Sequence, residues 1–176
     1  MEYKARPKLT FREALQKAFT EPISYNRRRR VRRSEYWWCM LACAIYTAFF
    51  AGLRFLIEDV FGINTSGWFG VVVFTLLSIP PIGMFLMETY GRLHDTNRRD
   101  TWLMGILIPI LFIILSFMLV YTHHPMLGAI GATVIILRIF PTAIALVFSA
   151  ICLVFCLKDS DKDENDYGPS PKYYTY

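Results

Sequence analysis

The chain has 176 residues, of which 55% are hydrophobic, and its 19 Lys and Arg outnumber its 14 Asp and Glu to give a net charge of +5. Helices of a soluble domain carry polar faces that recur every three or four residues, whereas here whole windows are apolar on every face and the charges lie between them. This distribution excludes an ordinary water-soluble globular fold and indicates that lipid surrounds the apolar segments.

The N-terminal segment 1–35 is polar and strongly basic, so we expect no cleavable signal peptide. Within it, residues 9–19 predict a short amphipathic helix, because Thr10 and Glu13 have the spacing of a capping box. Pro22 is expected to end this helix. The helix carries its apolar side chains on one face: Phe11, Leu15, Ala18 and Phe19. Such a helix either lies flat in a membrane interface or packs on the cytoplasmic loops, and the sequence leaves both open.

Four apolar stretches follow, and each predicts a helix that crosses a bilayer. A helix needs roughly 20 apolar residues to cross a hydrocarbon core about 30 Å thick. The later three stretches contain no charged residue, and the first includes Arg54 near its end, where the side chain can extend to the interface. The predicted spans are residues 36–57, 67–87, 102–121 and 139–157.

Residues 126–137 are apolar but too few to cross a bilayer, and Arg138 and Pro141 interrupt the sequence that follows them. We interpret them as a short interfacial or re-entrant piece, with inclusion in the fourth helix as the alternative.

Prolines inside the spans are expected to disturb the helices locally, because each removes a backbone hydrogen bond. These residues are Pro80, Pro81, Pro109 and Pro141.

The basic residues beside the spans predict the orientation of the chain. Of the 19 Lys and Arg, only Arg54 and Arg138 fall on the side opposite to the others, so both termini and the loop 88–101 are predicted to be cytoplasmic. Tryptophan prefers the headgroup layer, and the four tryptophans lie at starts of predicted spans: Trp37, Trp38, Trp68 and Trp102.

The two ends of the chain differ in charge. The basic run 27–33 lies directly before the first span, where it favours contact with anionic headgroups over nucleic acid. The tail 158–176 is acidic and then rich in Tyr and Pro, with little apolar surface to bury. We expect this cytoplasmic tail to be flexible or folded back against the arginines.

Three short segments carry a resemblance to a known family. Residues 30–38 (RVRRSEYWW) lead from arginines into the first span, residues 91–95 (GRLHD) follow the second span, and residues 165–171 (NDYGPSP) lie near the end. In order and spacing they resemble the domain of unknown function 805 family, small proteins of the bacterial inner membrane. The resemblance implies a multi-pass protein in that membrane, and it implies no established biochemical activity.

The loop after the second span holds the most informative polar residues. If the second helix continues past the membrane, Glu88, Arg92 and Asp95 lie on one face, and Glu35 heads the first span at the same depth. We therefore predict a Glu35–Arg92–Asp95 ionic cluster that joins the ends of the first two helices, the alternative being independent interfacial charges. The candidate structural, lipid-contact or partner-contact residues are Arg30, Arg33, Glu35, Trp37, Trp38, Glu88, Arg92, His94, Asp95, Trp102, Tyr167 and Gly168.

No catalytic or metal-binding residues are predicted. His94 lies beside Asp95, but a catalytic site also needs a nucleophile or metal and a shaped pocket, and His123 and His124 are predicted on the opposite side. Four cysteines form two pairs with i, i+4 spacing at similar depth: Cys39, Cys43, Cys152 and Cys156. A four-thiolate site is geometrically conceivable, but without a Cys-x-x-Cys motif we interpret them as small apolar packing residues.

The sequence thus predicts an all-α bundle of four transmembrane helices with an N-terminal amphipathic helix. The expected function is that of a non-enzymatic integral inner-membrane protein without a cofactor, which binds a partner protein or anionic lipid through its basic cytoplasmic face. Nucleic acid is not an expected partner. The alternative is a small transporter or channel subunit that acts as an oligomer, although the spans lack the ionisable groups that mark ion and substrate paths.

Overall fold

The computed structural model of the chain describes residues 3–21, 28–65, 67–122 and 127–175, with the side chains of 116–137 and 175 excepted. The expectations for Pro22, Arg27, His123, His124 and Met126 concern residues outside these ranges. The elements, in chain order, are β1 (Tyr3–Ala5), α1 (Phe11–Thr20), α2 (Arg33–Phe55), the π-helical turn η1 (Leu56–Val60), α3 (Trp68–Asp95), α4 (Thr101–Thr122), α5 (Leu127–Leu157) and β2 (Tyr173–Thr175).

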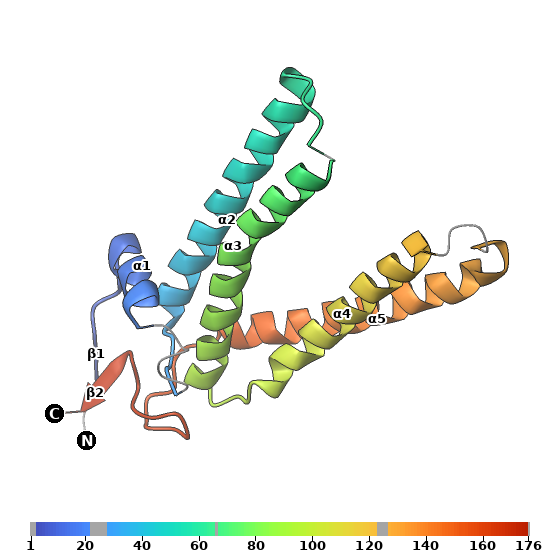
Figure 1. Ribbon diagram of the computed structural model, residues 1–176. Helices are drawn as coiled ribbons and strands as arrows, with labels where there is room; N and C mark the ends of the chain where they lie inside the picture. The colour runs from blue at the N-terminus through green and yellow to red at the C-terminus, as the bar shows by residue number, and fades with distance from the viewer. Residues whose placement is uncertain (1–2, 22–27, 66, 123–126, 176) are drawn as a thin grey trace.

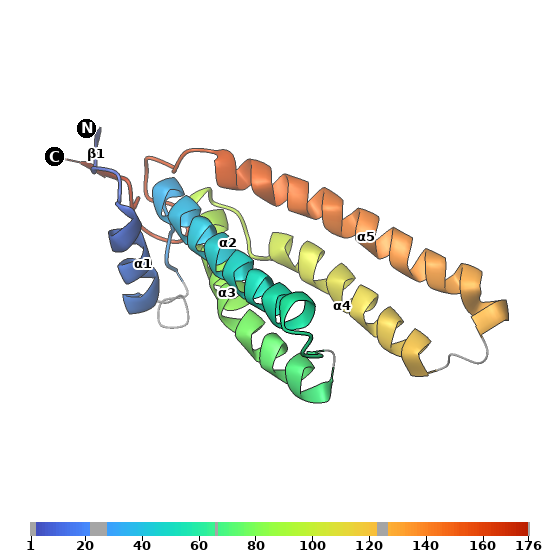
Figure 2. The ribbon, with the colours of Figure 1, turned by 90° about the horizontal axis from the view of Figure 1, so that it is seen from above.

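The long helices form two hairpins, α2 with α3 and α4 with α5, which diverge from a common end (Figures 1 and 2). At this end α2 and α4 begin and α3 and α5 finish, and we call it the charged end because the buried ionic residues lie there. Both chain termini lie next to it (Figure 1). Contacts between the hairpins are few compared with those inside each hairpin.

Three helical segments are long and apolar enough to cross a membrane: Arg33–Val60, Trp68–Asp95 and Arg138–Leu157. In α4 the residues with described side chains provide a shorter apolar stretch, Thr101–Leu115. The helical architecture predicted from the apolar stretches is therefore confirmed, whereas a fourth crossing at 102–121 stays a prediction.

The helix α1 begins at the predicted capping box. Thr10 is the N-cap, its hydroxyl accepts a hydrogen bond from the Glu13 backbone N–H, and the Glu13 carboxylate accepts one from the Thr10 backbone at 2.8 Å. These two bonds satisfy N–H groups that lack an intrahelical partner. The hydrogen bonds that the Thr10 backbone N–H and the Thr10 hydroxyl donate to the Glu13 carboxylate lower the pKa of that carboxyl. Only Ala14 of this helix is buried, while Phe11 and Phe19 stay exposed.

The interpretation of residues 126–137 as a separate interfacial or re-entrant piece was wrong for the described part of that segment. The backbone is one continuous helix over Leu127–Leu157. Pro141 removes one hydrogen bond, the one to the carbonyl four residues earlier, while its fixed φ remains helical. Because α4 packs along α5, neighbouring packing supports the helix through this interruption, as it does at Pro109 inside α4.

A two-stranded antiparallel sheet joins the two ends of the chain. β1 pairs with β2 in the register Tyr3↔Thr175, Lys4↔Tyr174 and Ala5↔Tyr173. Tyr3 also donates a hydrogen bond to Asp163.

Nearby, Asp159 accepts hydrogen bonds from Lys172 and Tyr173. Partial burial alone would raise the pKa of Asp159, but these hydrogen bonds together with one from the Ser160 backbone lower it below its ordinary value.

The hairpin of α4 and α5 depends on a close approach at Gly105. A Cβ at this position would lie 2.1 Å from the Phe148 ring of α5, whereas a Cβ at Gly52 in α2 would meet nothing within 4 Å. We predict that Gly105→Ala lowers the free energy of unfolding by about 1–3 kcal/mol through overpacking. Thermal unfolding in detergent measures this change.

The matched control is Gly52→Ala, which adds the same methyl group in open space. It should raise stability by up to about 1 kcal/mol, because alanine favours the helix more than glycine does. Equal effects of the two substitutions, in either direction, would contradict the described packing of α4 on α5.

Candidate functional site

Charged side chains are buried at the charged end to a degree that is unusual for proteins. Arg92 and Asp95 are 0% exposed, Glu35 is also 0%, and Glu88 is 1%. They lie on the last two turns of α3 and the first turn of α2. Charged residues are almost never fully buried unless they are paired. The ion pairs of these groups therefore determine which helices and segments meet at the charged end.

The first of two ionic clusters is centred on Asp95. Its carboxylate accepts a hydrogen bond from Arg92 on the same helix and another from Arg30 Nε at 3.2 Å. Arg92 also donates to three backbone carbonyls, those of Val31 at 3.3 Å, Cys156 at 3.2 Å and Lys158. Through Arg92, the end of α3 is therefore joined to the segment before α2 and to the end of α5.

The second cluster is centred on Arg29. Its guanidinium donates to Glu35 on α2 and to Glu88 Oε1 on α3, the latter at 3.2 Å. Lys17 of α1 adds a further ion pair, with Nζ 3.0 Å from Glu35 Oε2. This cluster joins α1, α2 and α3, and its two cations balance its two carboxylates.

The predicted Glu35–Arg92–Asp95 triad does not form as a single group. Arg92 does pair with Asp95, but Glu35 pairs with Arg29 and Lys17 instead. The physical reason is that the segment before α2 passes across the end of α3, where the Val31 backbone N–H donates to the Gly91 carbonyl at 2.9 Å. This placement brings Arg29 and Arg30 between the helices.

Arg29 was absent from the candidate residues, although the sequence holds a signal for it. Three acids that meet at one depth need more than one cation, and Arg92 alone leaves them with net negative charge. The basic run 27–33 is the nearest source. The run is expected to contact anionic headgroups, but in the structure Arg29, Arg30 and Arg32 are each about 5–6% exposed.

The tail folds over the first cluster rather than extending away from it. Arg30 donates to the carbonyls of Asp161 at 3.0 Å, Asp163 at 3.2 Å and Gly168 at 2.6 Å. Gly168 has φ of +113°, a conformation that side chains disfavour, so glycine is suited to this turn. The tail was expected to be either flexible or folded back against the arginines. Over these residues the structure shows it folded back against Arg30.

His94 is the second anchor of the tail. Its ring stacks on Tyr167 with centroids 3.7 Å apart, and Tyr90 meets it edge-on at 4.2 Å. Asn165 donates to the His94 backbone carbonyl at 2.9 Å. These contacts bury His94 to 1% exposure, so the residue holds the tail against the end of α3.

The tryptophan candidates and Arg33 lie around this centre. Trp38 packs edge-on against Phe11 and donates to the Leu9 carbonyl at 3.0 Å, so it holds α1 against α2. Trp102 packs against Phe155 of α5. Trp37 and Arg33 are exposed, and Arg33 donates to the Leu157 carbonyl at 3.4 Å.

The cysteines have different neighbours. Three of the thiols lie near backbone carbonyl oxygens. The distances are 4.0 Å from Cys39 to Ala14, 3.6 Å from Cys43 to Pro81 and 3.8 Å from Cys152 to Trp102. All four cysteines are free. Among the residues that the structure describes, no group of three metal-binding side chains forms.

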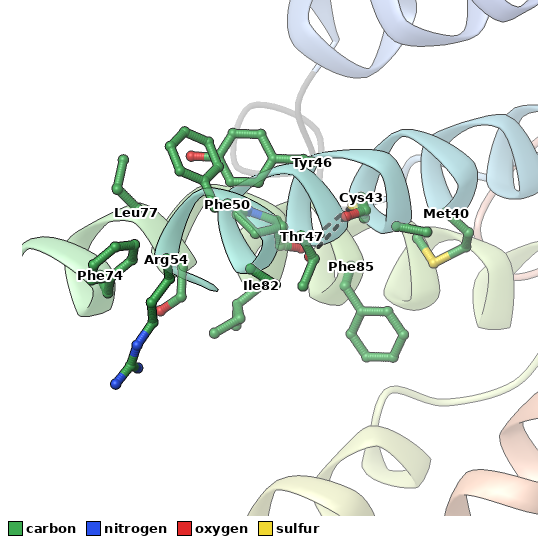
Figure 3. A pocket seen from close by; sticks show the side chains of 14 residues that line it. Met40, Cys43, Tyr46, Thr47, Phe50, Arg54, Phe74, Leu77, Ile82 and Phe85 are labelled. Atoms are coloured by element: carbon green, nitrogen blue, oxygen red, sulfur yellow. Dashed lines mark hydrogen bonds between the residues drawn. The ribbon is translucent and has the colours of Figure 1, made fainter. Parts of the chain in front are cut away.

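A cleft of about 580 Å³ lies between α2 and α3, away from the ionic clusters (Figure 3). Its lining is almost wholly apolar, with Phe50, Phe74 and Phe85 among its side chains. The Thr47 hydroxyl donates to the Cys43 carbonyl of its own helix at 2.8 Å. Arg54, the one charged residue among the described lining residues, pairs with Glu58 at 3.2 Å. The described lining of this cleft is therefore suited to apolar contacts.

Together the apolar helices and the buried charged end define a helical protein of the membrane type. The family model described as "Protein of unknown function (DUF805)" matches residues 24–169, and the chain belongs to this family. The match confirms the family resemblance of the sequence. It covers the whole first ionic cluster, the second cluster apart from Lys17, and the tail as far as Pro169, while β1, α1 and β2 lie outside it. Comparison with curated proteins and with solved structures gave no match.

We predict that Arg92→Gln lowers the free energy of unfolding by about 3–5 kcal/mol, because it leaves the buried Asp95 carboxylate with reduced compensation. Thermal unfolding in detergent measures the change. The control is Arg54→Gln, which breaks an ion pair whose side chains are 46% and 29% exposed and should cost less than about 1 kcal/mol. If the two variants melted at the same temperature, the buried cluster would not contribute to stability.

Proposed function

We propose that the chain is a non-enzymatic integral membrane protein that binds anionic lipid, or a partner protein, through a basic surface at the charged end. The surface consists of Lys4, Arg6, Lys8 and Arg12. It lies on β1, on α1 and on the segment between them. The observation that carries this proposal is that these four side chains are exposed and form no ion pair with any residue that the structure describes.

The chemistry of this surface suits a lipid headgroup layer. Each basic residue near an anionic membrane surface contributes about 1 kcal/mol of attraction. Phe11 and Phe19 lie exposed on the adjoining helix, and an apolar face beside cations is typical of helices that lie in the interface. By contrast, Arg29, Arg30 and Arg92 are occupied by carboxylates and carbonyls, so they stabilise the fold.

The proposed topology has four crossings, with both termini in the cytoplasm of a bacterial cell and the chain in the inner membrane. The length of α4, 22 residues or about 33 Å, supports a fourth crossing. The adjacent termini support an even number of crossings. The basic residues at the charged end support its cytoplasmic orientation under the positive-inside rule.

We expect the wild-type chain, extracted in native-lipid discs, to retain anionic lipid at a higher fraction than the bulk membrane holds. Replacing Lys4, Arg6, Lys8 and Arg12 together by Gln should reduce this enrichment several-fold, because four favourable contacts are lost. The enrichment should also fall with added salt, since exposed charges are screened. Mass spectrometry of the retained lipid measures it.

The control variant removes the same charge elsewhere at the charged end, by replacing Arg98, Arg99, Lys158 and Lys162 with Gln. Arg98 and Lys158 already lie over the Phe155 ring, at 4.8 and 5.5 Å, so a smaller effect is expected. Equal losses in both variants would contradict a specific surface at the N-terminal segment. A stoichiometric protein that is lost with the first variant alone would favour the partner-protein form of the proposal.

A further inference from the structure

We propose that a groove between α1, α2 and α3 binds one acyl chain of a phospholipid whose ammonium headgroup donates a hydrogen bond to Glu88. This site is distinct from the basic surface proposed above, and it selects a different headgroup.

The groove is formed by one wall from each of the three helices. α1 contributes Leu15 and Phe19, α2 contributes Tyr46, and α3 contributes Ile79 and Met84. Its volume is about 490 Å³, within the range of about 300–1,000 Å³ that ligand pockets occupy. Apart from Glu88 at its end, the Tyr46 hydroxyl and the Cys43 thiol, the described lining is apolar, so it suits a hydrocarbon chain.

The direction of the groove matches that of a lipid chain. Its lining on α3 runs from Ile79 to Glu88, about 14 Å along the helix axis. The polar residue lies at the charged end and the apolar residues extend away from it. Phe19 is 71% exposed and Ile79 57%, so the groove is open at its side, where a lipid can enter from the bilayer.

The polar end has an unsatisfied acceptor. Glu88 is 1% exposed and lines the groove. Its Oε1 accepts from Arg29, while Oε2 has no partner among the residues that the structure describes. A buried carboxylate oxygen without a donor is costly, and an N–H donor supplied by a ligand removes that cost.

The charge balance distinguishes between headgroups. The cluster next to the groove contains Lys17 and Arg29 against Glu35 and Glu88, so it has no net charge that would attract an anionic lipid. A zwitterionic phospholipid adds no net charge, and a primary ammonium supplies the missing N–H. A fully methylated choline headgroup has no N–H, so it cannot replace the ammonium at Oε2.

The test uses the full chain in detergent, incubated with equal amounts of phosphatidylethanolamine and phosphatidylcholine that have the same acyl chains. Native mass spectrometry then counts the lipids retained. We expect one phosphatidylethanolamine per chain, preferred over phosphatidylcholine by about tenfold or more, as suits a hydrogen bond to a charged group. Equal retention of the two lipids would overturn the proposal and indicate nonselective annular lipid.

Two variants locate the site. Gly83 lines the groove and a Cβ there meets nothing within 4 Å, so the side chain of Gly83→Leu should extend into the groove and abolish retention. Gly52→Leu is its control, because Gly52 is equally open but lies outside the groove, and retention should be unchanged. If Gly83→Leu retained the lipid as the wild type does, the assignment to this groove would be wrong.

Glu88→Gln tests the headgroup contact. It should reduce the preference for ethanolamine over choline to near one, because the carboxylate is lost while the shape is kept. A preference that persisted in a folded Glu88→Gln would overturn the role of Glu88. If that variant did not fold, the Gly83→Leu comparison and the lipid competition would still decide the proposal. Loss of the basic surface should not alter this selectivity, so the two proposals fail independently.

Discussion

The structure depends on the neutralisation of buried charge at one end of the helices. Three acids, Glu35, Glu88 and Asp95, lie there with almost no exposure, and unpaired they would be far too costly to bury. Arg29, Arg30 and Arg92 supply the compensating charge. Because these six residues come from α2, α3 and the segment before α2, the pairing fixes how the chain enters its first long helix.

This constraint explains why the hairpins are joined where they are. Elsewhere the helices expose apolar side chains along most of their length, and in lipid such surfaces have no hydrophobic reason to associate. At the charged end Arg92 reaches the carbonyl at the end of α5, and Arg30 holds the tail. Polar contacts therefore join hairpins that diverge elsewhere (Figure 1).

The sequence was most informative where one physical rule acts alone. Apolar length indicated the helices, and the spacing of Thr10 and Glu13 located the start of α1. It was less informative where several segments compete for the same partner. The pairing of Glu35 depends on the path of residues 28–32, which no periodicity encodes, and the continuity of α5 past Pro141 depends on packing with α4. His94 and Tyr167 were both candidates, but their stacking across 73 positions of sequence is a tertiary contact.

The measurement that tests this account most directly is a double-mutant cycle between Arg29 and Glu88, using Arg29→Met, Glu88→Gln and their combination. The two residues are 59 positions apart in the sequence, and Arg29 Nη1 lies 3.2 Å from Glu88 Oε1. The account predicts a coupling energy of about 1–3 kcal/mol in thermal unfolding, as expected for contacting charged groups in one network. Additive effects of the two substitutions would contradict it, because they would place Arg29 away from α3 and leave the buried acids without their cation.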